Sequence, residues 1–261
     1  MSTKYGVIVP CNGLTKDPLN GNYMLVMNRM DIDLKKYLQQ HHNKLTWKEK
    51  IQIVYYIVAA LENINLVNAI HRDLHSGNIL VKGIQRFIIS DLGFCGPADK
   101  PLKSIYGNLP YIAPEVIVDK EYTFKSDIYS IAMLMWEISS GQPPFSNHEH
   151  DYYLAMDIVN GMRPKIVSGT PLEYESLMEQ CWDADPLKRP DIDTLRKKMS
   201  EINLSYHKNE EQINSNVSNL QLNKNLNVST DSINSLVRNF SSKIYNFKDL
   251  PKPKNATRGK Y

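Results

Sequence analysis

The sequence predicts an α+β fold in which a small β portion is followed by a larger, mostly helical one. Short apolar runs bounded by turn residues occur within the first 30 residues and in one later hairpin. Apolar residues at 3- and 4-residue spacing, which is typical of amphipathic helices, recur from residue 34 to about residue 201. With 261 residues, 42% of them hydrophobic, the chain is long enough for one good-sized domain and a tail.

The β portion is predicted to begin with two strands, over residues 4–15 and 23–27. The first strand is expected to end in a turn at Asn12-Gly13, and a loop containing Asp17-Pro18 and Asn20-Gly21 leads to the second strand. By itself this stretch would be read as a plain β-hairpin.

A second hairpin is predicted where Ile79-Leu80-Val81 and Phe87-Ile88-Ile89 flank Lys82-Gly83. Asn78 immediately precedes the first of these strands, and Asp91 follows the second. Because a tight hairpin returns the chain to where it started, the side chains of Asn78 and Asp91 are expected at the same end of the hairpin.

The helical portion is predicted from caps and apolar stripes. Asp33 caps a short helix, and Thr46 with Glu49 forms a capping box that opens a long helix. Further helices are expected over residues 128–139, capped by Ser126-Asp127, and over residues 149–160, 172–182 and 191–201, the last capped by Asp191.

The composition changes at Asn203, so we divide the chain into a domain over residues 1–202 and a disordered tail over residues 203–261. The tail is rich in Asn and Ser, and it carries 9 Lys and Arg against 4 Asp and Glu. A solvated tail explains this charge better than binding to nucleic acid, so no nucleic-acid partner is expected.

Three cysteines lie far apart without metal-type spacing, which indicates free thiols in a reducing compartment. No signal peptide or apolar run of membrane-spanning length is evident. We therefore expect a cytoplasmic protein with no membrane partner.

One sequence motif contains the candidate catalytic residues. His71-Arg72-Asp73 is followed by Asn78, in the pattern H-R-D-x-x-x-x-N, and Asp91-Leu92-Gly93 and Ala113-Pro114-Glu115 come later. Asp73 is suited to orient an attacking hydroxyl and accept its proton, and Asn78 and Asp91 offer the hard oxygen ligands that Mg²⁺ selects. This combination is the protein-kinase signature, so the chain resembles a eukaryotic-type protein kinase over residues 5–202.

The resemblance implies a protein-kinase-like fold with a complete, mostly helical C-terminal lobe over residues 31–202. Residues 1–30 would supply only the last one or two strands of the N-terminal lobe. Details such as Cys181-Trp182 and Gly161-Met162-Arg163-Pro164 look most like the tyrosine-kinase-like group of Ser/Thr kinases.

The resemblance also implies the site and its ligands, which would be ATP, Mg²⁺ and a protein substrate. Asp73, Arg72, Asn78 and His75 would form the catalytic set, and Asn78 and Asp91 would hold the metal. The adenine would lie against Met27, the hinge at residues 28–30 (Asn28 and Met30 at its ends) and Leu80.

Residues 91–115 resemble an activation segment, in which a phosphate on Ser104 or Tyr106 could pair with Arg72. Unmodified loop hydroxyls remain the simpler interpretation. By resemblance, Glu115 and Arg189 form a buried salt bridge under this segment, and Asp127 holds the backbone of the catalytic loop.

The sequence also departs from the family. No G-x-G-x-x-G loop precedes residue 15, and no early lysine has the V-A-I-K context, so the N-terminal lobe is expected to be truncated. His75 stands where many Ser/Thr kinases have a lysine, and Asn108 replaces a threonine that usually bonds the catalytic aspartate. We expect this chain to bind ATP poorly and to transfer phosphate slowly, if at all.

Two functions remain open from the sequence. The first is an ATP-dependent protein kinase, more probable for Ser/Thr than for Tyr, that is weak or inactive as this chain alone. The alternative is a pseudokinase or truncated lobe that acts as a protein-binding, regulatory module. The sequence does not give the oligomeric state.

Overall fold

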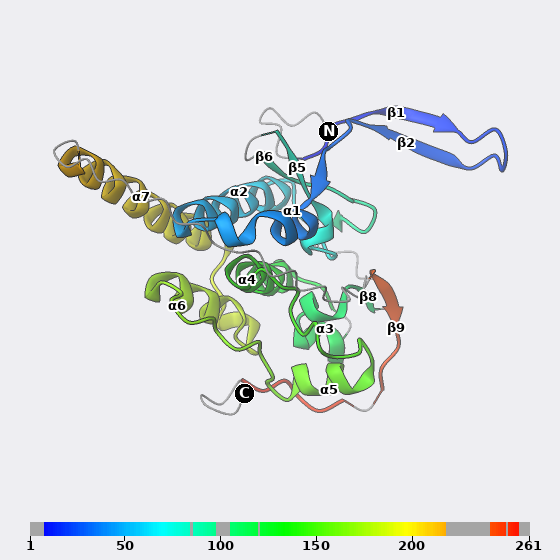
Figure 1. Ribbon diagram of the computed structural model, residues 1–261. Helices are drawn as coiled ribbons and strands as arrows, with labels where there is room; N and C mark the ends of the chain where they lie inside the picture. The colour runs from blue at the N-terminus through cyan, green and yellow to red at the C-terminus, as the bar shows by residue number, and fades with distance from the viewer. Residues whose placement is uncertain are drawn as a thin grey trace.

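The computed structural model describes residues 8–83, 86–97, 105–119, 121–217, 241–248 and 250–255 (Figure 1). Its helices and strands, in chain order, are β1 (Cys11–Lys16), β2 (Tyr23–Met27), β3 (Ile32–Asp33), α1 (Leu34–His41), α2 (Trp47–Asn65), β4 (Ala69–Ile70), β5 (Ile79–Lys82), β6 (Arg86–Ile89), β7 (Gly96–Pro97), β8 (Ile105–Gly107), α3 (Pro114–Asp119), α4 (Phe124–Ser140), α5 (Tyr152–Val159), α6 (Leu172–Cys181), α7 (Ile192–Val217) and β9 (Lys243–Tyr245). Short 3-10 turns are η1 (His42–Lys44), η2 (Ser76–Asn78), η3 (Leu109–Tyr111) and η4 (Pro186–Lys188). The predicted α+β fold with a large helical lobe is confirmed.

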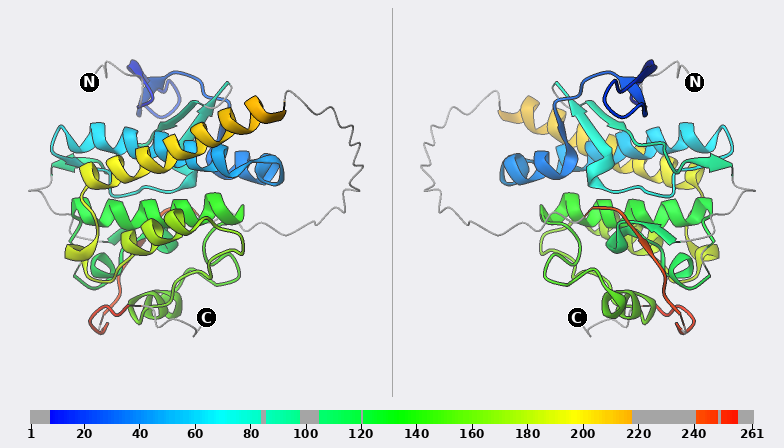
Figure 2. Two further views of the ribbon diagram at one scale, coloured as in Figure 1. Left: turned by 90° about the vertical axis from the view of Figure 1, so that its left-hand side faces the viewer. Right: turned by 90° about the vertical axis from the view of Figure 1, so that its right-hand side faces the viewer.

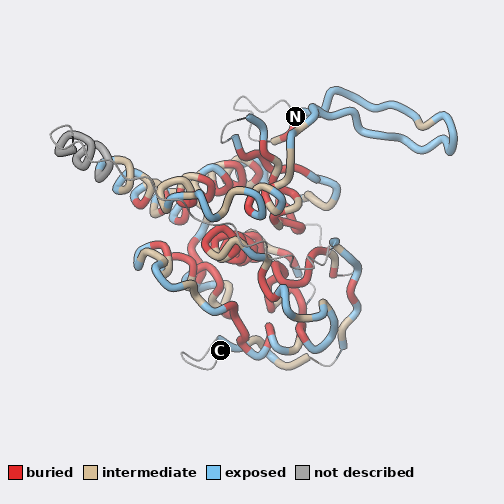
Figure 3. Tube along the Cα trace, in the orientation of Figure 1, coloured by how far each residue is buried: buried red, intermediate tan, exposed pale blue. Residues whose placement is uncertain are grey.

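Strands β1 and β2 form an antiparallel hairpin that projects from the body of the molecule (Figure 1) and is exposed along its whole length (Figure 3). The predicted turn at Asn12-Gly13 is wrong. Gly13 instead lies in a bulge within β1, where its positive φ of 147° suits glycine, and the chain reverses between Asp17 and Asn22.

The first two helices follow their predicted caps. The Asp33 carboxylate accepts a hydrogen bond from the Lys36 amide at the start of α1. Thr46 and Glu49 form both halves of the capping box that opens α2. The inner face of α2 is apolar and fully buried, with Ile57 among the core residues.

The predicted second hairpin is present as β5 and β6, and β3 completes a three-stranded antiparallel sheet in the order β3-β5-β6. The sheet packs beside α1 and α2 (Figure 2). Strands β4 and β7 form a separate two-stranded antiparallel sheet, which ties residues 69–70, just before the catalytic loop, to residues 96–97.

Helix α4 lies at the centre of the large lobe and is buried on nearly all sides (Figure 3). Its predicted cap is wrong, because the helix begins at Phe124 with Thr123 as the N-cap. Asp127 therefore lies inside the first turn rather than capping it. This position frees the Asp127 carboxylate to bond the backbone of another segment.

Helices α5, α6 and α7 complete the lobe, and the predicted Asp191 cap is present because its carboxylate accepts from the Thr194 amide. Helix α7 continues past residue 202 to Val217, and the predicted domain boundary at residue 202 stays a prediction. The predicted disordered tail is wrong for residues 241–248 and 250–255, which pack on the lobe. Residues 218–240 and 256–261 of that predicted tail lie outside the described residues.

Among the helices in the described part of the chain, none combines the length and the apolar character that crossing a membrane requires. The three cysteines are free thiols, as predicted.

Candidate active site

The catalytic loop, residues 71–78, is held from below by a single carboxylate. Asp127 accepts hydrogen bonds from the amide of His71 at 2.7 Å and from the amide of Arg72 at 3.0 Å. Arg72 has a φ of 71°, a left-handed conformation that is uncommon for a residue with a side chain. The two bonds to Asp127 hold the backbone in this turn, so the family role expected of Asp127 is observed in the contacts.

The imidazole of His71 joins the catalytic loop to the segment that carries Asp91. It is fully buried, its Nδ1 accepts from the Asp73 amide at 3.3 Å, and its Nε2 lies 3.0 Å from the carbonyl oxygen of Ser90. Ser90 in turn donates from its amide and its hydroxyl to the carbonyl oxygen of Asn78, at 2.8 and 3.0 Å. These bonds connect the His71–Asp73 turn, Asn78 and Ser90, the residue before Asp91.

Asn78 and Asp91 lie on the same side of the molecule as Asp73. The Asn78 amide nitrogen Nδ2 donates to the backbone oxygen of Asp73 at 2.8 Å and lies 3.4 Å from its Oδ2. Asp91 is exposed, and its negative charge contributes to the raised pKa of Asp73. The Ser90 amide, next to Asp91, donates to the carbonyl oxygen of Asn78, so residues 78 and 91 lie at the same end of the β5–β6 hairpin, and their joint binding of a metal stays a prediction.

The donor set fits Mg²⁺. The Asn78 oxygen Oδ1 takes part in neither bond to Asp73, and the exposed Asp91 carboxylate supplies a second hard oxygen. Within the described ranges, no three His, Cys, Asp or Glu side chains gather to hold a metal. A magnesium ion at Asn78 and Asp91 would therefore depend on phosphate oxygens for its remaining ligands, as in the nucleotide sites of kinases.

Asp73 has the electrostatics of a proton acceptor. Its side chain is buried, and burial raises the pKa of the carboxyl to about 6. The hydrogen bond from Ser242 lowers this pKa, whereas the charge of Asp91 raises it. A carboxylate whose pKa lies close to neutrality accepts a proton more readily than an ordinary one.

His75 is neutral in this site because burial lowers its pKa to about 4, with the nearby His71 acting in the same direction. Its Nδ1 accepts from the Gly77 amide at 3.1 Å, so the proton of the neutral ring resides on Nε2. The Nε2–H group lies 3.7 Å from Oδ1 of Asp73 and 3.1 Å from the Ser242 hydroxyl. His75 is thus an uncharged donor beside the base.

The Arg72 guanidinium reaches the activation segment. Its Nη1 and Nη2 donate to the backbone oxygens of Phe94 and Pro97, at 3.3 and 2.8 Å. Gly96 permits this approach, since a Cβ there would lie 2.9 Å from Nη1. The predicted pairing of Arg72 with a phosphorylated Tyr106 stays a prediction, and Ser104 lies outside the described residues.

The residues expected around adenine lie in β2, in the hinge at residues 28–30 and in β5. Asn28 follows β2 and donates from its amide to the carbonyl oxygen of Pro10 at 3.2 Å. The hinge is tied to β5 because the Asp31 amide donates to the carbonyl oxygen of Val81 at 3.0 Å. Met27 is exposed, and Leu80 and Met30 are half-buried, and the contact of these residues with adenine stays a prediction.

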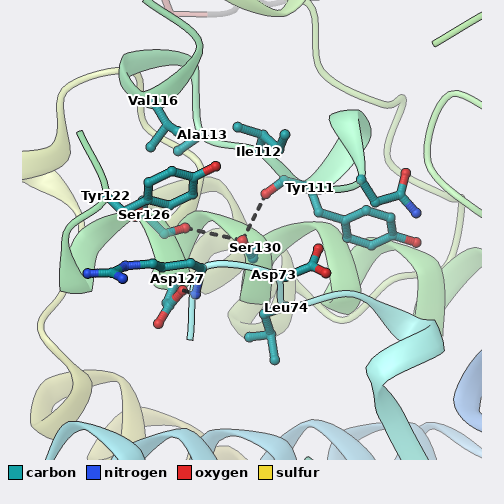
Figure 4. Close-up of a pocket in the computed structure, with 12 residues that line it drawn as sticks. Asp73, Leu74, Tyr111, Ile112, Ala113, Val116, Tyr122, Ser126, Asp127 and Ser130 are labelled. Carbon is teal, nitrogen blue, oxygen red and sulfur yellow. Dashed lines mark hydrogen bonds between the residues drawn. The ribbon is translucent and has the colours of Figure 1, made fainter. Parts of the chain in front are cut away.

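Two residues of the activation segment, Glu115 and Asn108, can be compared with the kinase pattern. Arg189 forms a bidentate ion pair with Glu115, with N–O distances of 2.7 and 2.6 Å. No hydrogen bond joins Asn108 to Asp73 among the described residues, and the buried Oδ1 of Asn108 has no partner there. It lines a cavity of about 10 Å³ beside Asp73, Asp127 and Ser130 (Figure 4), which is at the lower limit for one water and too small for a ligand.

Sequence reasoning missed two residues near the base. Glu137, buried in α4, accepts from Ser76 at 2.8 Å and from the Tyr111 hydroxyl at 2.7 Å, and burial raises its pKa to about 7. A lone carboxylate within an apolar helix was a signal that could have identified it. Ser242 had no such signal, because it lies in a stretch where serine and asparagine are frequent.

Comparison with known proteins agrees with this geometry. A family model described as protein tyrosine and serine/threonine kinase matches residues 2–199. A relative in Acanthamoeba polyphaga mimivirus, named as a serine/threonine-protein kinase/receptor, is 36% identical over 154 residues, which is 58% of this chain and 9% of that protein. A dual serine/threonine and tyrosine protein kinase of Homo sapiens is 33% identical over 171 residues, which is 64% of this chain and 18% of that protein. The chain thus spans less than a fifth of either relative.

Proposed function

Since the chain belongs to the protein tyrosine and serine/threonine kinase family, we propose that it transfers the γ-phosphate of ATP to a serine or threonine hydroxyl of a protein. The observation that carries this proposal is that Asn78 bonds to Asp73 while Ser90, the residue before Asp91, donates to the carbonyl oxygen of Asn78. Relatives named as serine/threonine kinases favour that specificity, although a dual-specificity relative is similar to the same extent.

Each residue has a distinct part in the proposed reaction. Bound Mg²⁺ would neutralise phosphate charge and orient the γ-phosphate. Asn78 and Asp91 would hold that ion, Asp73 would accept the proton of the attacking hydroxyl, and the Nε2–H of His75 would donate a hydrogen bond beside it. Arg72 would act indirectly, by holding the activation segment against the catalytic loop.

We propose that this activity is weak in the chain alone. Met27 and the rest of the β1–β2 hairpin are exposed, so the nucleotide side of the site is in contact with water. Electrostatic stabilisation of a transition state is smaller in a wet site than in a preorganised, dry one.

The hairpin also supports the second candidate, a protein-binding module. Apolar side chains cover it, including Leu14, Tyr23 and Leu25 with exposed fractions of 67%, 75% and 61%. Exposed apolar surface of this kind is typical of protein interaction sites.

One experiment separates the two candidates. Mg²⁺ and ATP should raise the melting temperature of the purified chain, and the chain should label a generic basic protein with phosphate. The variant Asp91→Asn should lose both effects, because it removes a charged ligand of the metal. If neither melting nor labelling responds to Mg²⁺ and ATP in the unaltered chain, the kinase proposal fails and the binding module is the candidate that is left.

The rate of transfer should depend on pH through Asp73. A protonated carboxyl cannot accept the proton of the hydroxyl, so the rate is expected to fall as the pH drops through about 6. Initial rates measured between pH 5 and pH 8, with the folded fraction checked by circular dichroism, would show this limb. A profile that stays flat down to pH 5 would exclude Asp73 as the proton acceptor.

A further inference from the structure

The C-terminal segment over residues 241–247 lies across the mouth of the candidate site. Its strand β9 pairs antiparallel with β8 of the activation segment, with Ile105 opposite Tyr245 and Gly107 opposite Lys243. The red strand in Figure 1 runs alongside β8 and then descends toward α5, and both side views agree (Figure 2). A distant part of the chain has thus added a strand to the edge of the activation segment.

This pairing is anchored by side chains further along the segment. Tyr245 is 8% exposed and stacks on Phe247 with ring centroids 5.4 Å apart, whereas Ile244, the residue before Tyr245, is 72% exposed. Beyond them, Lys254 donates from its amide to the carbonyl oxygen of Val159 at 2.8 Å. The side chain of Asn255 accepts from the Ala184 amide at 2.6 Å, so the chain that follows the segment is also attached to the lobe.

Ser242 occupies the position that an acceptor hydroxyl would need. Its Oγ donates to Oδ1 of Asp73 at 2.9 Å. The same Oγ lies 3.1 Å from Nε2 of His75, whose proton resides on that nitrogen. Because His75 donates to the hydroxyl and the hydroxyl donates to Asp73, the hydroxyl proton already points at the base.

We propose that the path along β8 beside Asp73 is the groove for an acceptor peptide, that residues 241–247 bind there as an intramolecular substrate, and that Ser242 is the hydroxyl that receives the phosphate. The inference rests on the proposed kinase function and adds to it a modification site and an occupant of the groove. The binding mode is strand addition, in which backbone pairing holds an extended peptide and individual side chains fix its register.

The transfer balances with ATP as the phosphate donor. Oγ of Ser242 forms a bond to the γ-phosphorus, and the bond from that phosphorus to the β–γ bridging oxygen breaks. The bond electrons leave with ADP, and the hydroxyl proton passes to Oδ1 of Asp73. The products are phosphoserine at position 242 and ADP.

While the segment is bound, it competes with any other protein substrate. A tethered peptide acts at a high effective concentration, on the millimolar scale for short linkers. External substrates should therefore be labelled several-fold faster once the segment is released.

The first test needs no phosphate transfer. The Tyr106 amide donates to the Tyr122 hydroxyl, on the side away from β9, so Ile105 and Gly107 face β9. Hydrogen exchange followed by NMR on the full chain should show slow amides at Lys243 and Tyr245 and a fast amide at Ile244. Rapid exchange at all three positions would overturn the proposal.

A pair of variants sharpens this test. Tyr245→Ala removes a buried anchor and should release the segment, so that the amides of Lys243 and residue 245 exchange rapidly. Ile244→Ala changes an exposed side chain of the same strand and should leave their exchange slow. Equal behaviour of the two variants would contradict the anchoring role of Tyr245.

The second test locates the phosphate. The full chain is incubated with Mg²⁺ and ATP, and phosphorylated residues are identified by mass spectrometry. Phosphate is expected on Ser242 at a rate independent of protein concentration, and equally in Ser241→Ala, whose altered residue is exposed. Labelling of an added protein without phosphate on Ser242 would overturn the proposal.

Failure of the kinase function and failure of the intramolecular substrate give different results. If no protein is labelled, including by Tyr245→Ala, the proposed kinase function fails, Ser242 is no acceptor, and the exchange data alone decide whether the groove is occupied. If an added protein is labelled while β9 exchanges freely, the kinase function stands and the intramolecular substrate is refuted.

Discussion

Replacing Asp73 by asparagine is expected to lower the rate of phosphate transfer by about 10²–10⁴-fold. Asparagine keeps the shape of the side chain but does not accept the proton of the attacking hydroxyl. Asp73 accepts from Asn78 through Oδ2 and from Ser242 through Oδ1, and the single oxygen of an asparagine amide can accept one of these two bonds. Single-turnover measurements with a generic protein substrate would give the rates of both proteins.

The same substitution should stabilise the fold at neutral pH. The pKa of the carboxyl is raised from 3.8 to about 6, so the folded state disfavours the charged form once the pH exceeds the unfolded value. At about 1.36 kcal/mol per pKa unit, Asp73→Asn is expected to gain about 2–3 kcal/mol at pH 7 and little at pH 3.5. Urea denaturation at the two pH values would measure this difference.

The prediction is specific because the transfer rate and the stability of the fold should change in opposite directions. A residue that served only to support the fold would lose stability and activity together when it is altered. Asp73→Asn should lose activity and gain stability, which is the expected trade-off for a strained functional group. Lower stability at pH 7, or unchanged transfer, would contradict the assignment of Asp73 as the base.

Replacing Arg189 by alanine is expected to destabilise the chain by about 3–5 kcal/mol. The Arg189 side chain is fully buried, forms the bidentate pair with Glu115, and donates to the backbone oxygens of Asp183 and Lys125. Its removal would leave a carboxylate and two carbonyl groups without these bonds. Urea denaturation monitored by tryptophan fluorescence would give the change in unfolding free energy.

A surface ion pair supplies the matched control. Lys36 lies 3.2 Å from Asp33 with 66% of its side chain exposed, so Lys36→Ala should cost less than about 1 kcal/mol. If the two alanine variants lose similar stability, the pair of Arg189 with Glu115 contributes no more than an exposed pair. The large effect assigned to burial would then be wrong.

Some features could be predicted because they depend on neighbours in sequence. The capping box at Thr46 and Glu49 and the cap at Asp33 involve residues three apart, and both are present. The β5–β6 hairpin brings Asn78 and Asp91 to one end for the same local reason. The pairing of Glu115 with Arg189 is long-range, and it was predicted only through resemblance to the kinase family.

Other features could not be predicted, because local signals competed. Asn12-Gly13 has the composition of a turn, but pairing with β2 places Gly13 in a bulge and moves the reversal to residues 17–22. Ser126-Asp127 has the composition of a cap, but Thr123 begins the helix one turn earlier. In the first case the pairing with β2 selected the conformation, and in the second the local capping box of Thr123 with Ser126 set the start of the helix.

The sequence by itself determined the class of fold, the catalytic motif and the chemistry that its side chains can perform, because those depend on residue types at fixed spacing. Only the tertiary structure decided what lies against that motif. Ser242 is 169 residues from Asp73 along the chain, and nothing local to either residue predicts their hydrogen bond. The burial of Asp73, and with it the raised pKa, likewise comes from segments that meet only when the chain has folded.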